Sequence, residues 1–375
     1  MPVHKAYRFR LYPNKEQEVL IAKTIGCSRF VFNRFLSLWN ETYQTTGKGL
    51  SYSACSSQLT QLKKELSWLQ EVDSHSLQSS LKHLADSFDR FLKKQNEAPR
   101  FKSKKNKVQS YTTNIEKKNQ LPEVSIAGSR MKLPKVGWVR FANSREVAGR
   151  ILNATVRRTP AGKYFVSLLV EMEVKEKTKT GSAVGIDVGL KDFAVLSNGK
   201  VYKNPKFFRT LEEKLAKAQG ILSRRQRLAI QQKKPLSEAK NVQKQRMKVA
   251  RIHEQIANAR TDYLQKITTE IIKNHDVIGI EDLNVSNMLK NRPLSKAISE
   301  VSWSEFRTML EYKAKWCGKK VIVVDPRYTS QKCHSCGHTA KENRRTQAAF
   351  SCVSCGHSEN ADINASRNIH DLAII

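Results

Sequence analysis

AVGIDVGLKDFAVLSNGKVY, residues 183–202, places Asp187 between apolar neighbours and then continues through two more short apolar segments. The pattern predicts an interior strand that carries a buried carboxylate, followed by a second strand that turns at Ser197–Gly199 into a third. A buried carboxylate without a partner destabilises a protein by several kcal/mol, so such a group is usually paired or bound to a cation. Gly185 and Gly189 keep the surroundings of Asp187 small.

A second acidic position lies in DVIGIEDLNV, residues 276–285. Glu281 follows a short apolar strand pattern, at the end where open α/β sheets place their sites, and Asp282 comes directly after it. Successive strand residues face opposite sides, so only one of these two acids can share a site with Asp187. We choose Glu281 and keep Asp282 as the fallback. Considered alone, an acid in such a position is more often a structural residue with hydrogen-bond or ion-pair partners than a catalytic residue.

Strand and helix patterns alternate around these two segments. Apolar residues recur at helical spacing from Ile252 to Ile271, and KKVIVVD, residues 319–325, is typical of a short buried strand. The alternation predicts an α/β domain with a mixed sheet over residues 179–375.

Four of the seven cysteines have the spacing of metal ligands. Cys333 and Cys336 form one pair, Cys352 and Cys355 form another, and fifteen residues separate the pairs. This spacing predicts a structural Zn²⁺ ribbon with four thiolate ligands at about residues 328–358, rather than four unrelated thiols. The repeated segments CHSCGH and CVSCGH include His338 and His357, which are alternative ligands, but four thiolates already fill a closed site. Ordinary buried thiols are expected at the remaining positions, Cys27, Cys55 and Cys317.

A third acid follows the second cysteine pair closely. Asp362 lies at the start of a predicted final helix, DINASRNIHDLAII, which could pack across the sheet. Acids from a first strand, a later strand and a terminal helix are the set expected of an RNase H-like nuclease. Two Mg²⁺ ions about 4 Å apart would hold the scissile phosphate there. The order Asp187, Glu281, Asp362 differs from the Asp–Asp–Glu order of cut-and-paste transposases.

The N-terminal half has a different organisation. VHKAYRFRLYP, residues 3–13, alternates apolar and basic residues as a half-exposed strand does, and helical spacing starts at Asn14 and continues to about residue 92. Strand patterns return over residues 131–173. We expect the first strand to pair with these later strands, which would make the helical block an insertion into a small β-barrel. Residues 175–182 predict a polar linker.

The charge balance indicates the class of partner. The chain has 67 Lys and Arg against 34 Asp and Glu, a net charge of +33 that is spread along its length. An excess of this size favours a nucleic-acid partner over the alternatives, a ribosome-like or membrane-surface protein. No apolar run approaches membrane-spanning length and no signal peptide opens the sequence, so we expect a cytoplasmic, nucleoid-associated protein of a prokaryote. Two basic helical segments at about residues 204–273 could follow a nucleic-acid backbone or be solvated faces.

With these residues in place, the chain resembles the TnpB (OrfB) family of transposon-encoded RNA-guided endonucleases, which are related to type V CRISPR effectors. The resemblance rests on KAYRFRLYPNKEQ, GCSRFVFNRFL, PRFKSK, GIDVGLKDFAVLSNG, IGIEDLNV, TSQKCHSCGH and CVSCGHSENADINASRNI. It implies a multidomain α+β protein with a β-barrel wedge domain at residues 1–13 and 108–178 and an inserted helical recognition domain at 14–107. It also implies an RNase H-like (RuvC) nuclease domain at 179–375 that contains the zinc ribbon.

The resemblance also implies an activity and its residues. The RuvC-like catalytic triad falls on Asp187, Glu281 and Asp362, which would hold two Mg²⁺ ions and cleave double-stranded DNA beside a short target-adjacent motif. A guide RNA derived from the transposon end would supply sequence recognition to a monomeric ribonucleoprotein. The positions that match the family's motif-reading surface are Tyr52, Ser56, Gln78, Thr113 and Asn114.

Two departures from the family pattern lie beside Asp362. The chain reads ENAD up to and including this acid, where relatives often have an acid and a basic residue just before it. After the acid it has Asn364-Ala365-Ser366 in place of Asn-Ala-Ala. Neither change removes a carboxylate, so we expect an active Mg²⁺-dependent endodeoxyribonuclease. The alternatives are a nuclease-inactive RNA-guided repressor, an RNA chaperone or a transposase accessory protein.

Overall fold

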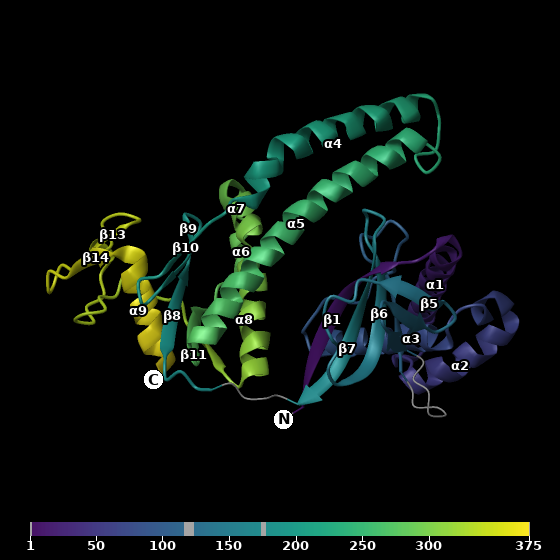
Figure 1. Ribbon diagram of the computed structural model, residues 1–375, viewed down its shortest axis with the longest axis horizontal. Helices are drawn as coiled ribbons and strands as arrows, with labels where there is room; N and C mark the ends of the chain where they lie inside the picture. The colour runs from purple at the N-terminus through teal and green to yellow at the C-terminus, as the bar shows by residue number, and fades with distance from the viewer. Residues whose placement is uncertain (1, 116–123, 174–177, 375) are drawn as a thin grey trace. The chain divides into compact units, whose positions relative to one another are not determined.

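The computed structural model describes residues 2–115, 124–173 and 178–374, and it divides into two compact units, Met1–Glu173 and Val174–Ile375 (Figure 1). Both units combine helices with a β-sheet, so the predicted mixture of α and β structure is confirmed. The predicted linker at residues 175–182 lies partly outside the described residues.

The first unit contains a seven-stranded antiparallel sheet in the order β2-β6-β7-β1-β5-β4-β3. The strands are β1 (Pro2–Tyr12), β2 (Gln109–Asn114), β3 (Ser125–Ala127), β4 (Arg130–Leu133), β5 (Gly137–Phe141), β6 (Arg150–Arg158) and β7 (Tyr164–Glu173). β1 pairs with β7 from Pro2↔Glu173 to Leu11↔Tyr164, which confirms that the first strand joins the later ones. Its alternation buries Tyr7, Phe9 and Leu11 in the core of the unit.

Helices occupy the chain between β1 and β2. They are α1 (Lys15–Thr46), α2 (Tyr52–Glu65), the short η1 (Ser67–Gln70) and α3 (Ser74–Leu92). Asn14 caps α1 as predicted: its side chain accepts a hydrogen bond from the Gln17 N–H, and the Gln17 side chain accepts one from the Asn14 N–H. All four helices share one apolar core, to which α1 contributes Phe32 and Phe35 and η1 contributes Leu69.

The second unit contains a five-stranded sheet in the order β10-β9-β8-β11-β12, and the predicted mixed character of this sheet is confirmed. Its strands are β8 (Ala183–Val188), β9 (Asp192–Leu196), β10 (Val201–Lys203), β11 (Val277–Glu281) and β12 (Lys320–Val324). β8, β11 and β12 run parallel, whereas β9 and β10 are antiparallel to their neighbours. The predicted turn between β9 and β10 is present, with Gly199 at a φ of +84°.

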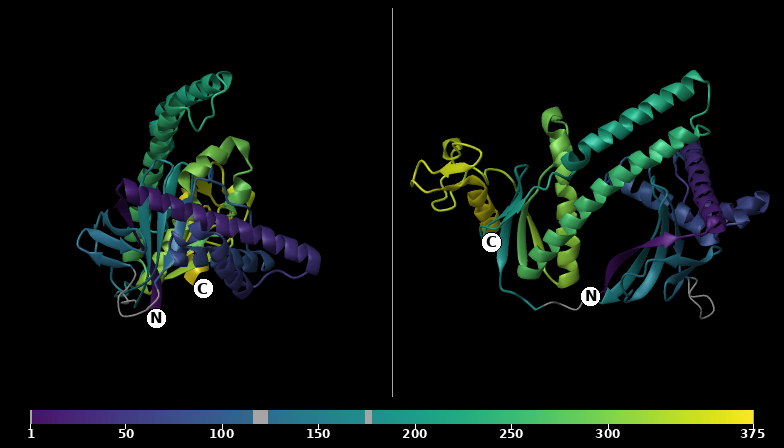
Figure 2. Two further views of the ribbon diagram at one scale, coloured as in Figure 1. Left: turned by 90° about the vertical axis from the view of Figure 1, so that its right-hand side faces the viewer. Right: turned by 45° about the horizontal axis from the view of Figure 1, so that its top comes forward.

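Helices cover both faces of this sheet (Figures 1 and 2). The helices of this unit are α4 (Phe207–Gln231), α5 (Lys240–Asn274), α6 (Val285–Met288), α7 (Arg292–Val301), α8 (Trp303–Cys317) and α9 (Ala361–Ile374), and α4 packs on α5 rather than on the sheet. The C-terminal half of α5 and all of α8 pack on one face, in a core that contains Ile186, Leu264 and Phe306. α9, coloured yellow, lies on the other face against β8 and β11.

A small two-stranded sheet, β13 (Ala349–Ser351) with β14 (Ser358–Asn360), follows the short helix η2 (Lys341–Asn343) and precedes α9. Phe350, Cys333, Cys352 and Ala361 form its core, so the start of α9 packs on this substructure. Within the described ranges, none of the helices combines the length and the apolar character that crossing a membrane would require.

Candidate functional site

Two glycines allow α9 to lie directly on the backbone of the sheet. A Cβ added at Gly185 would lie 2.1 Å from the Ser366 carbonyl oxygen, and one added at Gly279 would lie 2.8 Å from Ala373 Cβ. Both distances are far shorter than ordinary van der Waals contacts, so a side chain at either position would push α9 away from the sheet. The close approach brings the first turn of α9 to the edge of β8 and β11.

The same geometry places two predicted acids on the α9 face. Strand residues two apart share a face, so Asp187 and Glu281 point to the side on which Gly185 and Gly279 meet α9. β8 and β11 are parallel with Ile186 opposite Ile280, and the two acids are the next residue of each strand. They therefore lie side by side at the carboxyl ends of adjacent strands, where α/β sheets place their sites.

Electrostatic interactions join Asp362 to this pair. Burial raises the pKa of Asp187 well above its ordinary value, and the negative charges of Glu281 and Asp362 raise it further. Burial also raises the pKa of Glu281 and of Asp362. The structure thus brings together the three acids that the sequence analysis selected, in a region that favours the neutral form of a carboxyl unless positive charge is supplied.

The three carboxyl groups are more widely spaced than the cysteine ligands described below. Among the described residues, the cysteines are the only group of three or more potential ligands whose ligand atoms all lie within 4.8 Å of one another. A site for two ions about 4 Å apart does not require that spacing, since an outer carboxylate can bind one ion only. The acidic cluster therefore offers oxygen donors of the kind that hard divalent cations bind, spread more widely than the four thiols.

Asp282, the fallback for Glu281, lies on the opposite side of the strand. Its Oδ1 accepts a hydrogen bond from Nη1 of Arg307 at 2.5 Å, and Arg307 belongs to α8. Glu281 instead accepts a hydrogen bond on Oε1 from the Thr329 hydroxyl at 2.6 Å. The structure thus separates the two candidates and puts Glu281 with the other acids.

Arg344 is a residue of this site that the sequence analysis missed. It lies between η2 and β13, and its Nη2 is 3.5 Å from Oδ1 of Asp362. Its positive charge lowers the pKa of Asp187, Glu281 and Asp362 and so opposes the effect of burial on each. The sequence shows only two adjacent arginines in a basic loop, which does not indicate that one of them contacts the acids.

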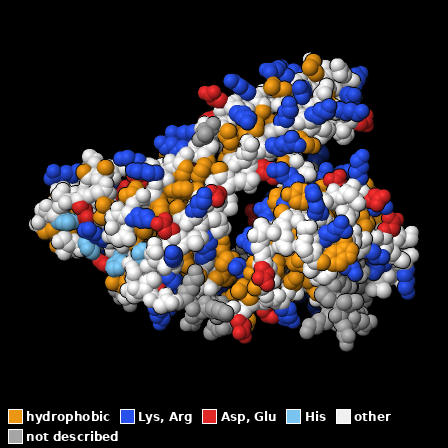
Figure 3. Space-filling model, in the orientation of Figure 1, with side chains coloured by type: hydrophobic (Ala, Val, Ile, Leu, Met, Phe, Trp, Pro, Cys, Tyr) orange, Lys and Arg blue, Asp and Glu red, His pale blue; other side chains and the backbone are white. Residues whose placement is uncertain are grey.

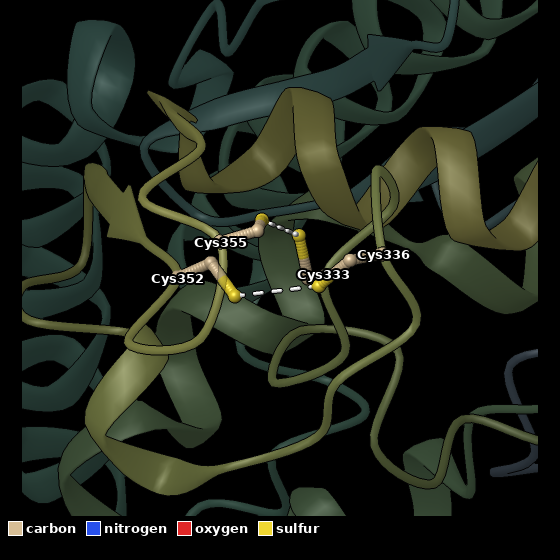
Figure 4. Close-up of side chains that lie close together, drawn as sticks. All are labelled: Cys333, Cys336, Cys352 and Cys355. Carbon is tan, nitrogen blue, oxygen red and sulfur yellow. Dashed lines mark hydrogen bonds between the residues drawn. The ribbon is translucent and has the colours of Figure 1, made fainter.

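The four predicted metal ligands converge (Figure 4). Sγ of Cys333 is 3.7 Å from that of Cys355, and Sγ of Cys336 is 3.6 Å from that of Cys352. Tetrahedral Zn²⁺ with Zn–S bonds of about 2.3 Å requires sulfur–sulfur distances of about 3.8 Å, so the cluster fits a structural zinc ion. Hydrogen bonds from the N–H groups of Cys355 and Ser354 lower the pKa of Cys352, which favours the thiolate that binds metal.

The two cysteine pairs sit in equivalent turns. The Cys333 N–H donates to the His338 carbonyl oxygen and the Cys352 N–H donates to that of His357, while Gly337 and Gly356 have φ values of +78° and +74°. The alternative ligands His338 and His357 thus contribute main-chain oxygens to the turns. Of the other thiols, Cys27 and Cys55 are buried as expected, whereas Cys317 is only half-buried.

Two buried asparagines of α9 tie the zinc ribbon to the acidic cluster. The Asn364 side chain accepts a hydrogen bond from the His334 N–H at 3.0 Å and donates to the Lys332 carbonyl oxygen at 2.8 Å. Asn368 donates to the carbonyl oxygens of Lys332 and Thr329 at 2.7 and 2.9 Å. Since Thr329 also contacts Glu281, this network connects the first cysteine turn to the helix of Asp362 and to the strand of Glu281.

The residues expected to read a DNA motif fall into two groups. Tyr52 Oη and Ser56 Oγ both donate to Gln78 Oε1, at 3.0 and 3.2 Å, which leaves the Gln78 amide N–H groups as donors for a base. Thr113 and Asn114 lie at the end of β2, where Asn114 is half-buried and Thr113 is completely buried. No sequence pattern indicated that Thr113 is inaccessible.

The two basic segments form the helical hairpin of α4 and α5. The helices contact each other closely, and Lys and Arg side chains gather along the hairpin in Figure 3. Where α4 packs on the N-terminal half of α5, the described residues form two small apolar clusters, one around Leu215, Ile252 and Ile256 and one around Ala229, Ala239 and Val242. The hairpin therefore presents a long basic surface on a narrow apolar seam.

Comparison with known proteins shows consistent similarity along the chain. Residues 167–292 match the OrfB/IS605 family described as "Probable transposase", residues 303–369 match "Cas12f1-like, TNB domain", and residues 1–48 match the OrfB/IS605 "Helix-turn-helix domain". In the last region, the described residues 2–48 form β1 and the single long helix α1 instead of two short helices.

Two relatives align over nearly the whole chain. The chain is 38% identical to "Putative RNA-guided DNA endonuclease InsQ" of Escherichia coli (strain K12), over 97% of this chain and 91% of that protein. It is 35% identical to "Putative RNA-guided DNA endonuclease" of Streptomyces pristinaespiralis, over 98% and 89% of the two chains. The solved structure "Cryo-EM structure of the Cas12f1-sgRNA-target DNA complex" has a similar fold, with a TM-score of 0.62 over 98% of this chain and 99% of that chain at 14% identity.

Proposed function

The chain belongs to the OrfB/IS605 (TnpB) family, whose members include the E. coli and Streptomyces proteins above, and from this premise we propose that it is an RNA-guided DNA endonuclease. The observation that carries the proposal is the convergence of Asp187, Glu281 and Asp362 at one edge of the mixed sheet. The substrate is double-stranded DNA of a target beside a short motif, and the reaction is hydrolysis of a phosphodiester bond.

The three carboxylates are the metal ligands of this active site. They are hard oxygen donors whose mutual repulsion raises the pKa of Asp187, so a divalent cation would relieve unfavourable charge at this position. Bound Mg²⁺ would supply Lewis-acid activation of water and stabilisation of the leaving oxygen. Arg344 favours the ionised form of the carboxyl groups and so partly offsets the effect of burial on the pKa of all three. The Thr329 hydroxyl fixes one oxygen of Glu281 and so orients the other.

The remaining parts of the chain have supporting roles in this proposal. The seven-stranded sheet is the wedge domain, residues 1–13 and 108–178, and the helices within residues 14–107 form the recognition domain. Residues 179–375 are the RuvC-like nuclease domain, in which the ribbon at about 328–358 holds one structural Zn²⁺. The basic hairpin of α4 and α5 suits a nucleic-acid backbone.

Recognition combines two mechanisms. A guide RNA from the transposon end pairs with the target strand, and the protein reads the adjacent duplex motif with Tyr52, Ser56, Gln78, Thr113 and Asn114. The amide donors of Gln78 and Asn114 suit the acceptor atoms on a base edge, whereas Thr113 requires local rearrangement before it can contact one. The active form is a monomeric ribonucleoprotein that acts on the nucleoid in a prokaryotic cytoplasm.

The test is cleavage by the ribonucleoprotein purified with its own RNA from cells that express the native locus. With Mg²⁺ it should cut a plasmid that carries the guide's target, and Asp187→Ala, Glu281→Ala and Asp362→Ala should each abolish cutting while target binding persists. Asp282→Ala is the matched control, because this neighbouring acid pairs with Arg307 on the other face, and it should still cut. Retained cutting in a triad variant would remove that residue from the site, and binding without any cutting by the unchanged protein would instead indicate a repressor.

A further inference from the structure

A polar cavity of about 190 Å³ lies in the first unit between α1, α3, the loop before β2 and β2 itself. Three of its lining residues are basic: Arg29 from α1, His83 from α3 and Lys102 from the loop. No acidic residue is among the described residues that line it. The cavity thus has three basic side chains and no carboxylate to neutralise them, which favours an anionic ligand.

The basic side chains are held in position by specific contacts. Arg29 donates from Nη1 to Gln109 Oε1 at 3.2 Å, and the Gln109 amide donates to three carbonyl oxygens of the loop, those of Ser103, Lys104 and Asn106. The backbone of Lys102 exchanges two hydrogen bonds, of 2.7 and 2.9 Å, with the Asn33 side chain. These contacts fix the loop against α1, so the cavity is formed before any ligand arrives.

Lys102 also packs its charge against an aromatic ring. Its Nζ lies 3.7 Å from the centroid of the Phe32 ring, and burial lowers the pKa of Lys102. Burial lowers the pKa of His83 as well, and the positive charge of Lys102 lowers it further, against a smaller opposing effect of Asp86. Both side chains nevertheless keep exposed surface, so a ligand can reach them from solvent. Their positive charges repel each other, and a bound anion would relieve this repulsion.

A neutral donor completes the cavity. Tyr111 lines it from β2, and its buried hydroxyl has no hydrogen-bond partner within the described parts of the chain. Burial raises the pKa of Tyr111, and the negative charge of Asp73, which lies outside the cavity lining, raises it further, so the group remains a protonated donor. A buried hydroxyl without a partner is destabilising, and the oxygen of an anion would accept from it.

We propose that this cavity binds one backbone phosphate of the DNA duplex that contains the target-adjacent motif, through Arg29, Lys102 and Tyr111. The choice of DNA rests on the proposed function and on position: the cavity is walled by α3 and β2, and the same two elements carry the motif-reading residues Gln78, Thr113 and Asn114. A phosphate held here would fix the register of the duplex, while the neighbouring side chains read its bases.

The experiment uses the guide-loaded ribonucleoprotein carrying Asp187→Ala, so that bound DNA is not cut. Its affinity is measured for target duplexes in which a single methylphosphonate, which lacks the phosphate charge, replaces each backbone position around the motif in turn. One position should weaken binding by roughly 10- to 100-fold. Lys102→Gln and Arg29→Gln should each weaken binding of unmodified DNA by a similar factor and lower the slope of log affinity against log salt by about 1.

The decisive result concerns the binding free energy of a doubly altered complex. At that one DNA position, the losses caused by the methylphosphonate and by Lys102→Gln should not add up. In the Lys102→Gln protein, the methylphosphonate there should have little further effect, because the contact it removes is already lost. Lys64→Gln, a matched loss of charge at the exposed end of α2, should leave the methylphosphonate pattern unchanged. Melting temperatures of the variants establish that they are folded, and Arg29→Gln provides the same test if Lys102→Gln is unstable.

Three outcomes would overturn the proposal. If the losses from Lys102→Gln and from the methylphosphonate add up at every DNA position, the cavity does not bind a backbone phosphate of the duplex. If they fail to add up only for methylphosphonates in the guide RNA, the cavity binds the RNA instead. Competition by inorganic phosphate without coupling to any nucleic-acid position would indicate an adventitious ion only. In each case, cleavage by the ribonucleoprotein with Asp187 intact would show that the proposed endonuclease function survives, whereas a chain that never cuts would contradict that function instead.

Discussion

Replacing Gly185 with alanine should misplace the helix that carries Asp362. The added Cβ would lie 2.1 Å from the Ser366 carbonyl oxygen and 2.4 Å from the His370 nitrogen, whereas ordinary contacts begin at 3.4 Å. These are backbone atoms of α9, so no rotamer change can relieve the overlap, and α9 must move away from β8 by about 1 Å. Overpacking of this kind destabilises a protein by about 1–3 kcal/mol.

The effect on catalysis should exceed the effect on stability. A displacement of about 1 Å in a reacting group typically lowers the rate about 100-fold. In single-turnover cleavage with saturating ribonucleoprotein, Gly185→Ala should therefore cut about 100-fold more slowly, while its affinity for the target DNA changes little, because the substitution lies on the side of the sheet that faces α9.

Two other glycines provide a graded comparison. At Gly279 the nearest atoms are Ala373 Cβ at 2.8 Å and the Ile369 carbonyl oxygen at 2.9 Å, so Gly279→Ala should slow cleavage less than Gly185→Ala does. Gly220 lies in α4 with nothing within 4 Å of an added Cβ, so Gly220→Ala should cut normally and gain roughly 0.5–1 kcal/mol of stability. Wild-type cleavage and an unchanged melting temperature in Gly185→Ala would refute the close packing of α9 on the sheet.

Other perturbations test the zinc ribbon, its connection to α9 and the core of the second unit. Removing zinc with a chelator, or Cys333→Ser, should abolish cleavage and expose the ribbon to proteolysis; full activity without zinc would contradict the link between the ribbon and the active site. Asn364→Ala should lower the melting temperature by an amount that corresponds to about 1–3 kcal/mol and slow cleavage more than it weakens DNA binding. It leaves the His334 N–H without its partner and removes one of the two side-chain donors, Asn364 and Asn368, from the Lys332 carbonyl oxygen. Equal losses in binding and cleavage would instead indicate general unfolding. Burial lowers the pKa of Lys313 to about 8, so the free energy of unfolding should fall by up to about 3 kcal/mol as the pH is lowered from 10.5 to 8, where the unfolded chain binds the proton first. In Lys313→Met this part of the pH dependence should disappear from melting curves, and an identical pH profile in both proteins would show that Lys313 is not the group responsible.

Local sequence patterns were sufficient for several features. The cap at Asn14, the strand around Asp187, the turn before Gly199 and the ligand spacing of Cys333 and Cys336 all depend on residues close together in the chain. Hydrogen bonds of caps and turns, the two-residue period of strands and the geometry of a metal-binding turn involve only short segments, so the sequence of each segment determines them.

The tertiary structure decided which of these features meet. The sequence could name three acids, but the two glycines that let α9 reach the sheet, and the strand register beside them, bring the acids to one edge. Because successive strand residues face opposite sides, the sequence left Glu281 and Asp282 as alternatives. The ion pair of Asp282 with Arg307 of α8 decides between them, since it places Asp282 on the face away from the other acids.

Features built from distant segments left no pattern in the sequence at all. Arg344 reaches the acids from the ribbon, Asn364 and Asn368 hold the first cysteine turn, and the basic cavity combines two helices, a loop and a strand. Each depends on contacts between residues separated by about twenty to eighty positions, as between Arg344 and Asp362 or Arg29 and Gln109. Such contacts arise only when the whole chain has folded, because the free energy that forms them comes from the burial of entire elements and not from the residues that meet.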